Sequence, residues 1–266
     1  MSSKGIYTAV SGAIAQSSRL DTIANNIANS NSTGFKKDRQ VFSEYLSSYE
    51  KEQQLMKVPR VPASVESFYD MQGGDKAYVN PAGTYTDHSQ GLMKSTGRNL
   101  DFGIEGKGFF EVLTPQGVRW TRNGSFTING EGQLVTHAGY PVLVQGNQPP
   151  EQRVVQVGNQ KMTVSKQSDI YIGGAPVGRL ALMDFPDPTQ IRKEGAGLFQ
   201  RNSEEVLPVP VNDSVRVHQG FVEGSNVNVV EEMTDMIMAQ RVFEATQQAI
   251  KAFDHMDDKL INGVGR

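Results

Sequence analysis

The fold of this chain is decided by the stretch EGSNVNVVEEMTDMIMAQRVFEATQQ, residues 223–248, whose pattern continues to Leu260 and Ile261. Its apolar residues recur three or four positions apart, which is the spacing of a helix and not the alternation of a strand. They form one stripe of Val229, Met233, Met236, Ile237, Phe243 and Ile250, and a second stripe of Ala239, Val242, Ala249, Phe253, Met256 and Leu260. The sequence therefore predicts one long helix.

The start and the length of this helix can also be predicted. Asn228 can cap it, and Glu231, three residues on, can reach back as in a capping box. No Gly or Pro interrupts the chain from Val227 to Asn262. At 1.5 Å per residue such a helix is on the order of 50 Å long, which exceeds one face of a small domain. Periodic patterns of this length are typical of coiled coils, membrane spans or helical repeats, and the charges exclude a span.

The first thirty residues predict a second helix. Apolar residues recur on a heptad-like repeat of fours and threes, the spacing of a coiled-coil seam, at Ile6, Val10, Ala13, Leu20, Ala24 and Ile27. Small residues such as Ala9 and Gly12 would let a neighbouring helix approach closely. The polar run of residues 29–33 competes for backbone hydrogen bonds, and Gly34 can take the left-handed conformation that ends the helix.

The long helices lie at opposite ends of the sequence, so we predict that they form one coiled-coil-like helical domain into which the rest of the chain is inserted. Periodicity alone leaves an alternative open, an ordinary helical hairpin that closes a globular fold.

The inserted region changes character twice. Residues 36–48, with Val41, Phe42, Tyr45 and Leu46, favour a further short helix. Pro and Gly residues up to Gly83 then indicate an extended linker.

From Thr84 onward, short β-type runs alternate with turn signals, among them Asn123-Gly124 and Asn129-Gly130, which favour tight hairpins. We therefore expect an antiparallel sandwich or barrel and an α+β fold. The predicted parts are an N-terminal helical segment (1–48), a linker (49–83), a β-rich domain (84–215) and a C-terminal helical segment (216–266).

Composition narrows the function. The net charge of −3 over 266 residues gives no basic field for nucleic acid or an anionic membrane. The chain has no cysteine, which excludes disulfides, thiolate zinc sites and a thiol nucleophile. We expect no cleaved signal peptide and no membrane insertion, because the first residues contain no long apolar block.

No catalytic, cofactor-binding or metal-binding constellation is predicted. The glycine cluster GIEGKGFF (103–110) lacks the spacing of a phosphate loop, and glycines packed between strands explain it better. The acidic cluster of residues 254–258 is better explained as a solvated helix face than as a metal site. Trp120, Tyr140, Phe109 and Phe110 are compatible with a glycan or peptide groove, although core packing is the commoner role of strand aromatics.

Three stretches, in order, resemble one family. LDTIANNIANSNSTGFKKDR (20–39) resembles the N-terminal signature of flagellar rod and hook proteins. LDFGIEGKGFFEV with WTRNGSFTINGEGQLVTHAGYPVL (100–143) resembles their shared β-domain core, and VHQGFVEGSNVNVVEEMTDMIMAQRVFEATQQAI (217–250) resembles their closing helix. Length and the segment VGRLALMDFPDPTQIRKEGAGLF (177–199) favour the proximal rod type over the distal type. Residues 50–83 match no pattern of the family.

The resemblance implies a structural subunit that assembles through its terminal helices into the helical drive shaft of the flagellum and transmits torque. The implied partners are copies of itself, adjacent rod subunits, the hook as a further candidate, and the flagellar export apparatus, with no cofactor and no nucleic acid. The implied location is the basal-body rod that spans the periplasm, reached without a cleaved signal. The rival hypothesis from the residues is a soluble β-domain that binds a glycan or peptide and is dimerised by its helices.

Two sets of residues are predicted to matter for assembly. The helix-packing set is Ile6, Val10, Ala13, Leu20, Ala24, Ile27, Met233, Ile237, Phe243, Ile250 and Phe253. The capping and motif set is Asn25, Asn26, Asn29, Gly34, Phe35, Asn226 and Asn228.

Overall fold

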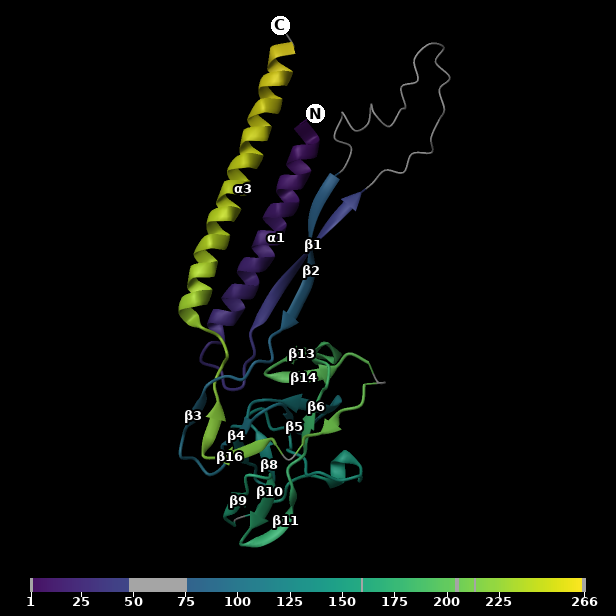
Figure 1. The fold of residues 1–266 in the computed structure, drawn as a ribbon, viewed down its shortest axis with the longest axis vertical. Coiled ribbons are helices and arrows are strands. Elements are labelled where there is room, and N and C mark those ends of the chain that lie inside the picture. The colour runs from purple at the N-terminus through teal and green to yellow at the C-terminus, as the bar shows by residue number, and fades with distance from the viewer. Residues whose placement is uncertain (1, 48–75, 159, 204–205, 213, 265–266) are drawn as a thin grey trace, which may run out of the picture. The chain divides into compact units, whose positions relative to one another are not determined.

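The computed structural model describes residues 2–47, 76–158, 160–203, 206–212 and 214–264. The chain divides into two compact units. Unit 1 comprises Met1–Ala24, Gln40–Thr84 and Met233–Arg266, and unit 2 comprises Asn25–Arg39 and Tyr85–Glu232. Long helices at both ends of the sequence and antiparallel strands between them confirm the α+β fold (Figure 1).

The two long helices dominate unit 1. Helix α1 is Ser2–Ala28 and helix α3 is Val229–Val264, and they lie side by side in Figure 1. A Cβ atom built on Gly5 would come within 2.9 Å of Phe253 Cζ, and one built on Gly12 within 3.9 Å of Thr246 Cγ2. The two contacts are seven residues apart on each helix and run in opposite directions, so the helices are antiparallel. A coiled-coil supertwist stays a prediction.

The helix predicted for residues 36–48 was wrong, because these residues contain a strand. Strand β1 (Asp38–Ser47) pairs with β2 (Lys76–Thr86) in a two-stranded sheet. Its β-branched and aromatic residues suit a pleated surface, and Gln40 bonds two hydroxyls of α1, Ser18 and Thr22, at 2.8 and 3.0 Å. Residues 48–75 of the predicted linker lie outside the described residues.

Unit 2 holds the β-rich region, and its described strand pairings are antiparallel. The largest sheet has the order β13-β14-β6-β5-β12-β15. Its strands are β5 (Phe109–Thr114), β6 (Gly117–Thr121), β12 (Leu182–Asp184), β13 (Ile191–Gly195), β14 (Leu198–Arg201) and β15 (Val209–Pro210).

Smaller sheets complete the unit. A three-stranded sheet contains β9 (Met162–Val164), β10 (Asp169–Ile172) and β11 (Ala175–Arg179). The strand pairs are β3 (Met93–Ser95) with β17 (Phe221–Glu223), β4 (Phe102–Glu105) with β16 (Arg216–Gln219), and β7 (Phe126–Ile128) with β8 (Leu134–Thr136). Two short 3₁₀ helices cover Pro150–Gln152 and Pro188–Gln190.

Two apolar clusters form the core of unit 2. The larger one contains Phe102, Phe110, Leu134, Val142, Ile170 and Leu180, among others. The smaller one consists of Phe109, Trp120, Phe185, Ile191 and Phe199, with Trp120 and Phe185 in edge contact at 5.0 Å between ring centroids. A polypeptide with this much buried apolar surface can fold around its own core.

The two Asn-Gly dipeptides behave differently. Asn129-Gly130 lies in the β7–β8 hairpin as predicted, although the left-handed residue there is Gly132, with φ of 79°. Asn123-Gly124 joins β6 to β7, which are not paired with each other. Glycine is needed at position 124 because a Cβ atom there would lie 1.7 Å from the Phe102 carbonyl oxygen. A sequence signal for a turn thus marked a close backbone approach.

The C-terminal segment predicted to be helical from residue 216 begins with the strands β16 and β17. Helix α3 starts at Val229, and the Asn228 side-chain oxygen accepts a hydrogen bond from the Val230 amide at 3.2 Å. The predicted N-cap is therefore confirmed. Among the described residues, the helices fall short of the length and apolarity that crossing a membrane requires.

Candidate functional site

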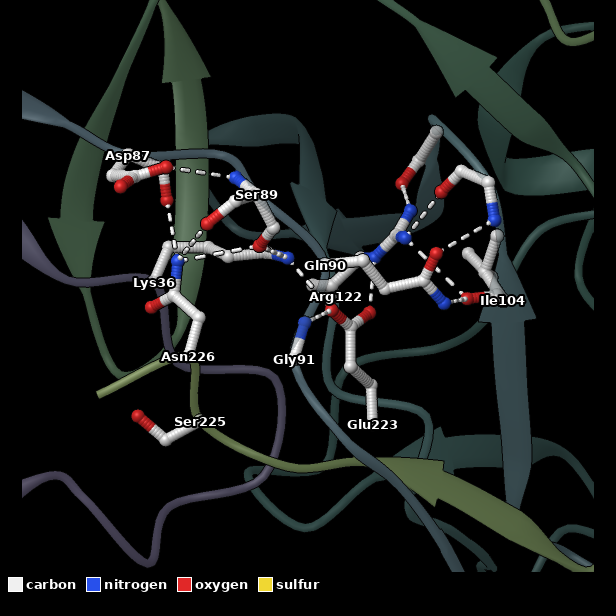
Figure 2. Close-up of polar contacts among 12 residues, drawn as sticks. Lys36, Asp87, Ser89, Gln90, Gly91, Ile104, Arg122, Glu223, Ser225 and Asn226 are labelled. Atoms are coloured by element: carbon white, nitrogen blue, oxygen red, sulfur yellow. Dashed lines mark hydrogen bonds and ion pairs between the residues drawn. The ribbon is translucent and has the colours of Figure 1, made fainter. Parts of the chain in front are cut away.

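A buried carboxylate lies at the centre of a polar cluster in unit 2. Glu223, at the end of β17, is 1% exposed. Its Oε1 accepts hydrogen bonds from Lys36 Nζ at 2.7 Å and from the Gly91 amide at 2.8 Å, and its Oε2 accepts one from Arg122 Nε. Figure 2 shows the carboxylate between these donors, which come from three separate stretches of the sequence. Such a buried charge is stable only with its partners in place.

Arg122 connects this cluster to the glycine-rich stretch singled out in the sequence. Its guanidinium donates to the carbonyl oxygens of Gly106, Gly108 and Ile104, the last at 3.4 Å. Gln90 also bonds this stretch, donating to the Ile104 carbonyl at 3.1 Å. A loop that turns carbonyl oxygens toward a cation cannot cradle phosphate, which requires N–H donors. The stretch is therefore an arginine-binding loop.

Lys36 contributes the second cation of the cluster. It is 2% exposed, and its ammonium also donates to the Ser89 carbonyl at 2.7 Å. Burial lowers the pKa of Lys36 from its ordinary value, while the Glu223 carboxylate opposes that shift. Because Lys36 follows α1 and Glu223 precedes α3, one ion cluster holds both chain segments on the β-rich fold of unit 2.

Two of the predicted asparagines connect separate stretches of the chain. The Asn226 side chain accepts from the Lys37 amide at 2.7 Å and donates to the Asp87 carbonyl at 2.8 Å. The buried Asn26 side chain accepts from the Asp38 amide at 3.0 Å and donates to Glu232 Oε2 at 3.2 Å.

The other asparagines act locally. Asn29 donates to the Asn25 carbonyl at 2.9 Å, in the turn that ends α1. These contacts give the asparagines structural roles, whereas a part in assembly stays a prediction.

Gly34 and Phe35 fix the path of the chain after α1. Gly34 has φ of 69°, and a Cβ atom there would lie 2.5 Å from the Arg122 carbonyl carbon. The Gly34 amide donates to the Glu223 carbonyl at 2.8 Å. The ring of Phe35 lies under Lys193 Nζ at 4.1 Å, and the same ammonium pairs with Asp38 at 2.8 Å. Glycine is thus required at position 34 by both its conformation and its lack of space.

His88 lies beside this cluster without a hydrogen-bond partner for its buried ring nitrogens. Its ring packs against Phe109 and Phe199 with centroid separations of 5.8 and 5.7 Å. Burial, together with the charges of Lys36 and Lys193, lowers the pKa of His88 to about 4. At neutral pH this histidine is therefore uncharged.

The faces of α1 and α3 that approach each other follow strict heptads. On α3 they are Glu232, Met236, Ala239, Phe243, Thr246, Ile250 and Phe253, each buried or partly buried. On α1 they are Gly5, Ala9, Gly12, Gln16, Arg19 and Ile23, each also buried or partly buried. This α1 face lies one residue before the predicted repeat, because the small residues Gly5, Ala9 and Gly12 permit the closest approach.

The predicted helix-packing residues divide between covered and uncovered surface. Those that are partly buried are Ile6, Ala13, Leu20, Ile27, Phe243, Ile250 and Phe253. Those that are exposed are Val10, Ala24, Met233 and Ile237, and Ile237 is 53% exposed. Further apolar side chains are also exposed: Tyr7 at 64%, Ile14 at 58% and Met238 at 56%. The helices thus offer apolar surface that neither covers on the other.

The aromatic residues considered for a groove are core residues instead. Trp120, Phe109 and Phe110 are buried, and Tyr140 packs partly buried against the larger cluster. Within the described part of the chain, no three His, Asp or Glu side chains come together as metal ligands would. The site is a set of packing surfaces and buried charges.

Comparison with known proteins places these features in a family. The family described as "Flagella basal body rod protein" matches residues 6–36, "Flagellar hook protein FlgE/F/G D1 domain" residues 103–171, and "Flagellar basal body rod FlgEFG protein C-terminal" residues 218–263. The flagellar basal-body rod protein FlgF of Caulobacter vibrioides is 34% identical over 263 residues, which are 98% of this chain and 98% of that protein. The chain belongs to the flagellar basal-body rod protein family.

Rod proteins named FlgG are equally similar. That of Borreliella burgdorferi is 34% identical over 260 residues, covering 95% of this chain and 96% of its own length. That of Buchnera aphidicola subsp. Schizaphis graminum is 32% identical over 263 residues, covering 96% and 97%. The preference for the proximal type therefore stays a prediction. Membership of this family makes the chain a structural protein of the flagellar basal body rather than an enzyme, with rod and hook subunits as its class of neighbours.

The buried cluster contains one residue from each matched region: Lys36, Arg122 and Glu223. Sequence reasoning missed all three. A lysine, an arginine and a glutamate are ordinarily surface residues, and 187 positions separate Lys36 from Glu223. The signal that could have found them is their position inside the quoted family motifs rather than any local pattern.

Proposed function

We propose that this rod subunit assembles through its helices, with copies of itself and with adjacent rod and hook subunits, into the helical shaft that transmits torque. The observation that carries the proposal is the apolar surface of α1 and α3, above all Ile237, Met238 and Tyr7, which are each more than half exposed. Apolar side chains at this density along a helix are stabilised when a neighbouring subunit removes them from water. Repeated contacts between unlike faces build an open helical assembly.

The mechanism is mechanical. Burial of one apolar side chain at a subunit interface contributes about 1.5–3 kcal/mol to its stability. Because the contact repeats in every subunit, the assembled shaft resists shear. The β-rich unit adds rigidity through its two core clusters and the Lys36–Glu223–Arg122 ion cluster. No step of this function breaks or forms a covalent bond.

We extend the proposal to location and delivery. A subunit of the rod crosses the inner membrane through the flagellar export apparatus, without a cleaved signal, and joins a rod that spans the periplasm. The absence of cysteine suits such a route, because a thiol-free chain cannot be trapped by oxidation while it is unfolded.

The test replaces one exposed apolar residue with a charge. Ile237→Asp should abolish swimming and leave the subunit soluble and folded, because the desolvation of a carboxylate opposes burial in an interface. Swimming in soft agar and purified basal bodies are the readouts, with the tryptophan fluorescence of the subunit as a check on folding.

Gln247→Asp is the matched control, since residue 247 is exposed on the same helix and already polar. It should swim normally. Normal swimming and normal basal bodies in the Ile237→Asp strain would contradict assembly through α3.

A further inference from the structure

Helix α3 carries a second heptad seam, and each of its residues is exposed. It consists of Met238, Val242, Ala245, Ala249, Ala252 and Met256, which are all apolar and all exposed. The residues step by four and three, as a helix-packing seam does. At 100° per residue this seam lies roughly a third of a turn from the seam that faces α1. One helix therefore presents two separate packing faces.

Helix α1 also carries a second seam, roughly opposite to the face it turns toward α3. Its N-terminal half is bulky and apolar, with Tyr7, Val10 and Ile14 all exposed. Farther along the same seam lies the exposed acidic residue Asp21.

The two uncovered seams are complementary in shape and charge. One antiparallel register places Tyr7 opposite Ala252, Val10 opposite Ala249, and Ile14 opposite Ala245. Each bulky side chain then meets a small one, which is the geometry of interdigitating helices. The same alignment places Asp21 opposite Met238, one turn from the exposed Arg241. A shift of one heptad in either direction would instead set Val10 against Val242 or Met256.

Other partners fit less well. Both parallel registers of the same seams set two large residues against each other: Tyr7 meets Val242 in one register, and Ile14 meets Met256 in the other. Two copies of the α3 seam facing each other would bring alanine opposite alanine and bury little area. In a head-to-tail assembly all copies point the same way, so α1 of a neighbour is antiparallel to α3 just as α1 of the same chain is.

We infer that the seam Met238, Val242, Ala245, Ala249, Ala252, Met256 of one copy binds the seam Tyr7, Val10, Ile14 of the next copy. The inference rests on the proposed assembly and names the partner of its α3 surface. Each α3 then lies between the α1 of its own chain and the α1 of its neighbour. Because the two seams differ, the contact cannot close on itself as a symmetric dimer and repeats indefinitely.

The absence of cysteine from the natural chain permits a direct test. The double variant Ile14→Cys with Ala245→Cys is expressed in a flagellated strain in place of its native subunit. Basal bodies are then oxidised mildly and analysed without reductant. Facing positions come within the Cα separation that a disulfide allows, so a ladder of dimers, trimers and larger species is expected.

Controls make the result specific. Either single variant alone should stay monomeric on the gel, because position 14 faces position 245 and not another copy of itself. The pair Ile14→Cys with Gln247→Cys should also stay monomeric, because residue 247 lies on another face of α3. Dimers of the single variant Ala245→Cys, or a disulfide within one chain, would overturn the inference.

The outcomes separate this inference from the proposed function. Normal basal bodies without a ladder would overturn the seam pairing and leave helix-mediated assembly standing. If the double cysteine variant forms no basal bodies, the pairing is tested by exchanging a large and a small residue between the two seams. Val10→Ala and Ala249→Val should each reduce swimming, and the two together should restore it. Equal swimming in the three strains, or an additive loss, would also overturn the pairing.

Discussion

The two units of this subunit differ in which side chains they bury and which they expose. Unit 2 buries charge: the Glu223 carboxylate pairs with both Lys36 and Arg122, and backbone carbonyls accept hydrogen bonds from the remaining donors. Unit 1 exposes apolar surface, and its helices leave Tyr7, Ile14 and Ile237 more than half uncovered. Unit 2 pairs its buried charges internally and can be stable alone. Unit 1 leaves apolar surface in water, which a neighbouring subunit would bury.

The largest loss of stability is expected at Glu223, which pairs with both buried cations of unit 2. Glu223→Gln should lower the free energy of unfolding by roughly 3–5 kcal/mol, because two buried cations lose their counter-charge. Urea unfolding followed by the fluorescence of Trp120, the single tryptophan, measures it. Glu105→Gln, at an exposed carboxylate that pairs with His218, should leave the midpoint unchanged. Equal midpoints for the two variants would contradict the central place of Glu223.

A slightly smaller loss is expected at the glycine that shapes the chain after α1. Gly34→Ala should cost roughly 2–3 kcal/mol, because alanine is strained in the left-handed region and its Cβ would meet the Arg122 backbone. Gly130→Ala is the control, since Gly130 is outside the left-handed region and open space surrounds its Cβ position. Similar unfolding free energies for both variants would show that the contact with Arg122 is not tight.

The pH dependence of unit 2 should depend on His88. Its pKa in the folded protein is about 4, below the ordinary value of 6.5, so the unfolded chain takes up the proton first. The stability contributed by the neutral ring is fully present above pH 6.5 and is lost as the pH falls from 6.5 to about 4.

Allowing for partial exposure, the loss should be on the order of 1–2 kcal/mol. His88→Leu should flatten the stability profile in that window relative to the natural chain, as urea midpoints at several pH values would reveal. If the variant instead shifted the stability at every pH equally and kept the slope between pH 6.5 and 4, the acid sensitivity would belong to other groups.

The smallest effect is expected in unit 1. Met238→Gln should change the unfolding free energy of the isolated subunit by less than about 0.5 kcal/mol, because the side chain is already in water. The same change should reduce the yield of purified basal bodies. A large loss of subunit stability would mean that Met238 is covered within one chain, and the contrast between the units would weaken.

Local patterns predicted the parts of the fold that depend on neighbouring residues. The period of α3, its Asn228 cap and the left-handed conformation of Gly34 follow from sequence and were confirmed. Gly34 does not end the first helix as predicted, because α1 already ends at Ala28. The prediction failed where distant contacts decide. Residues 38–47 form a strand because β2 pairs with them, and the sequence around residues 38–47 does not reveal this distant partner.

The candidate site shows the same limit. Apolar stripes indicated that the helices pack. The α1 residues closest to α3 lie one position before the predicted repeat, because small residues mark the closest approach. Packing of the predicted set with adjacent subunits stays a prediction. No local pattern predicts the ion cluster, since its three charges meet only in the folded β-rich unit. The apolar face of a helix can be predicted from the period of its sequence. A buried polar cluster depends on contacts between residues that are far apart in the sequence.

Amide hydrogen exchange on the dilute full-length subunit tests the central claim most directly. We predict slow exchange for the β-rich residues of unit 2 and markedly faster exchange in residues 2–24 and 233–264, which should become protected in assembled rods. Strong protection of both helices in a proven monomer would show a self-contained helical hairpin and would contradict completion by neighbouring subunits.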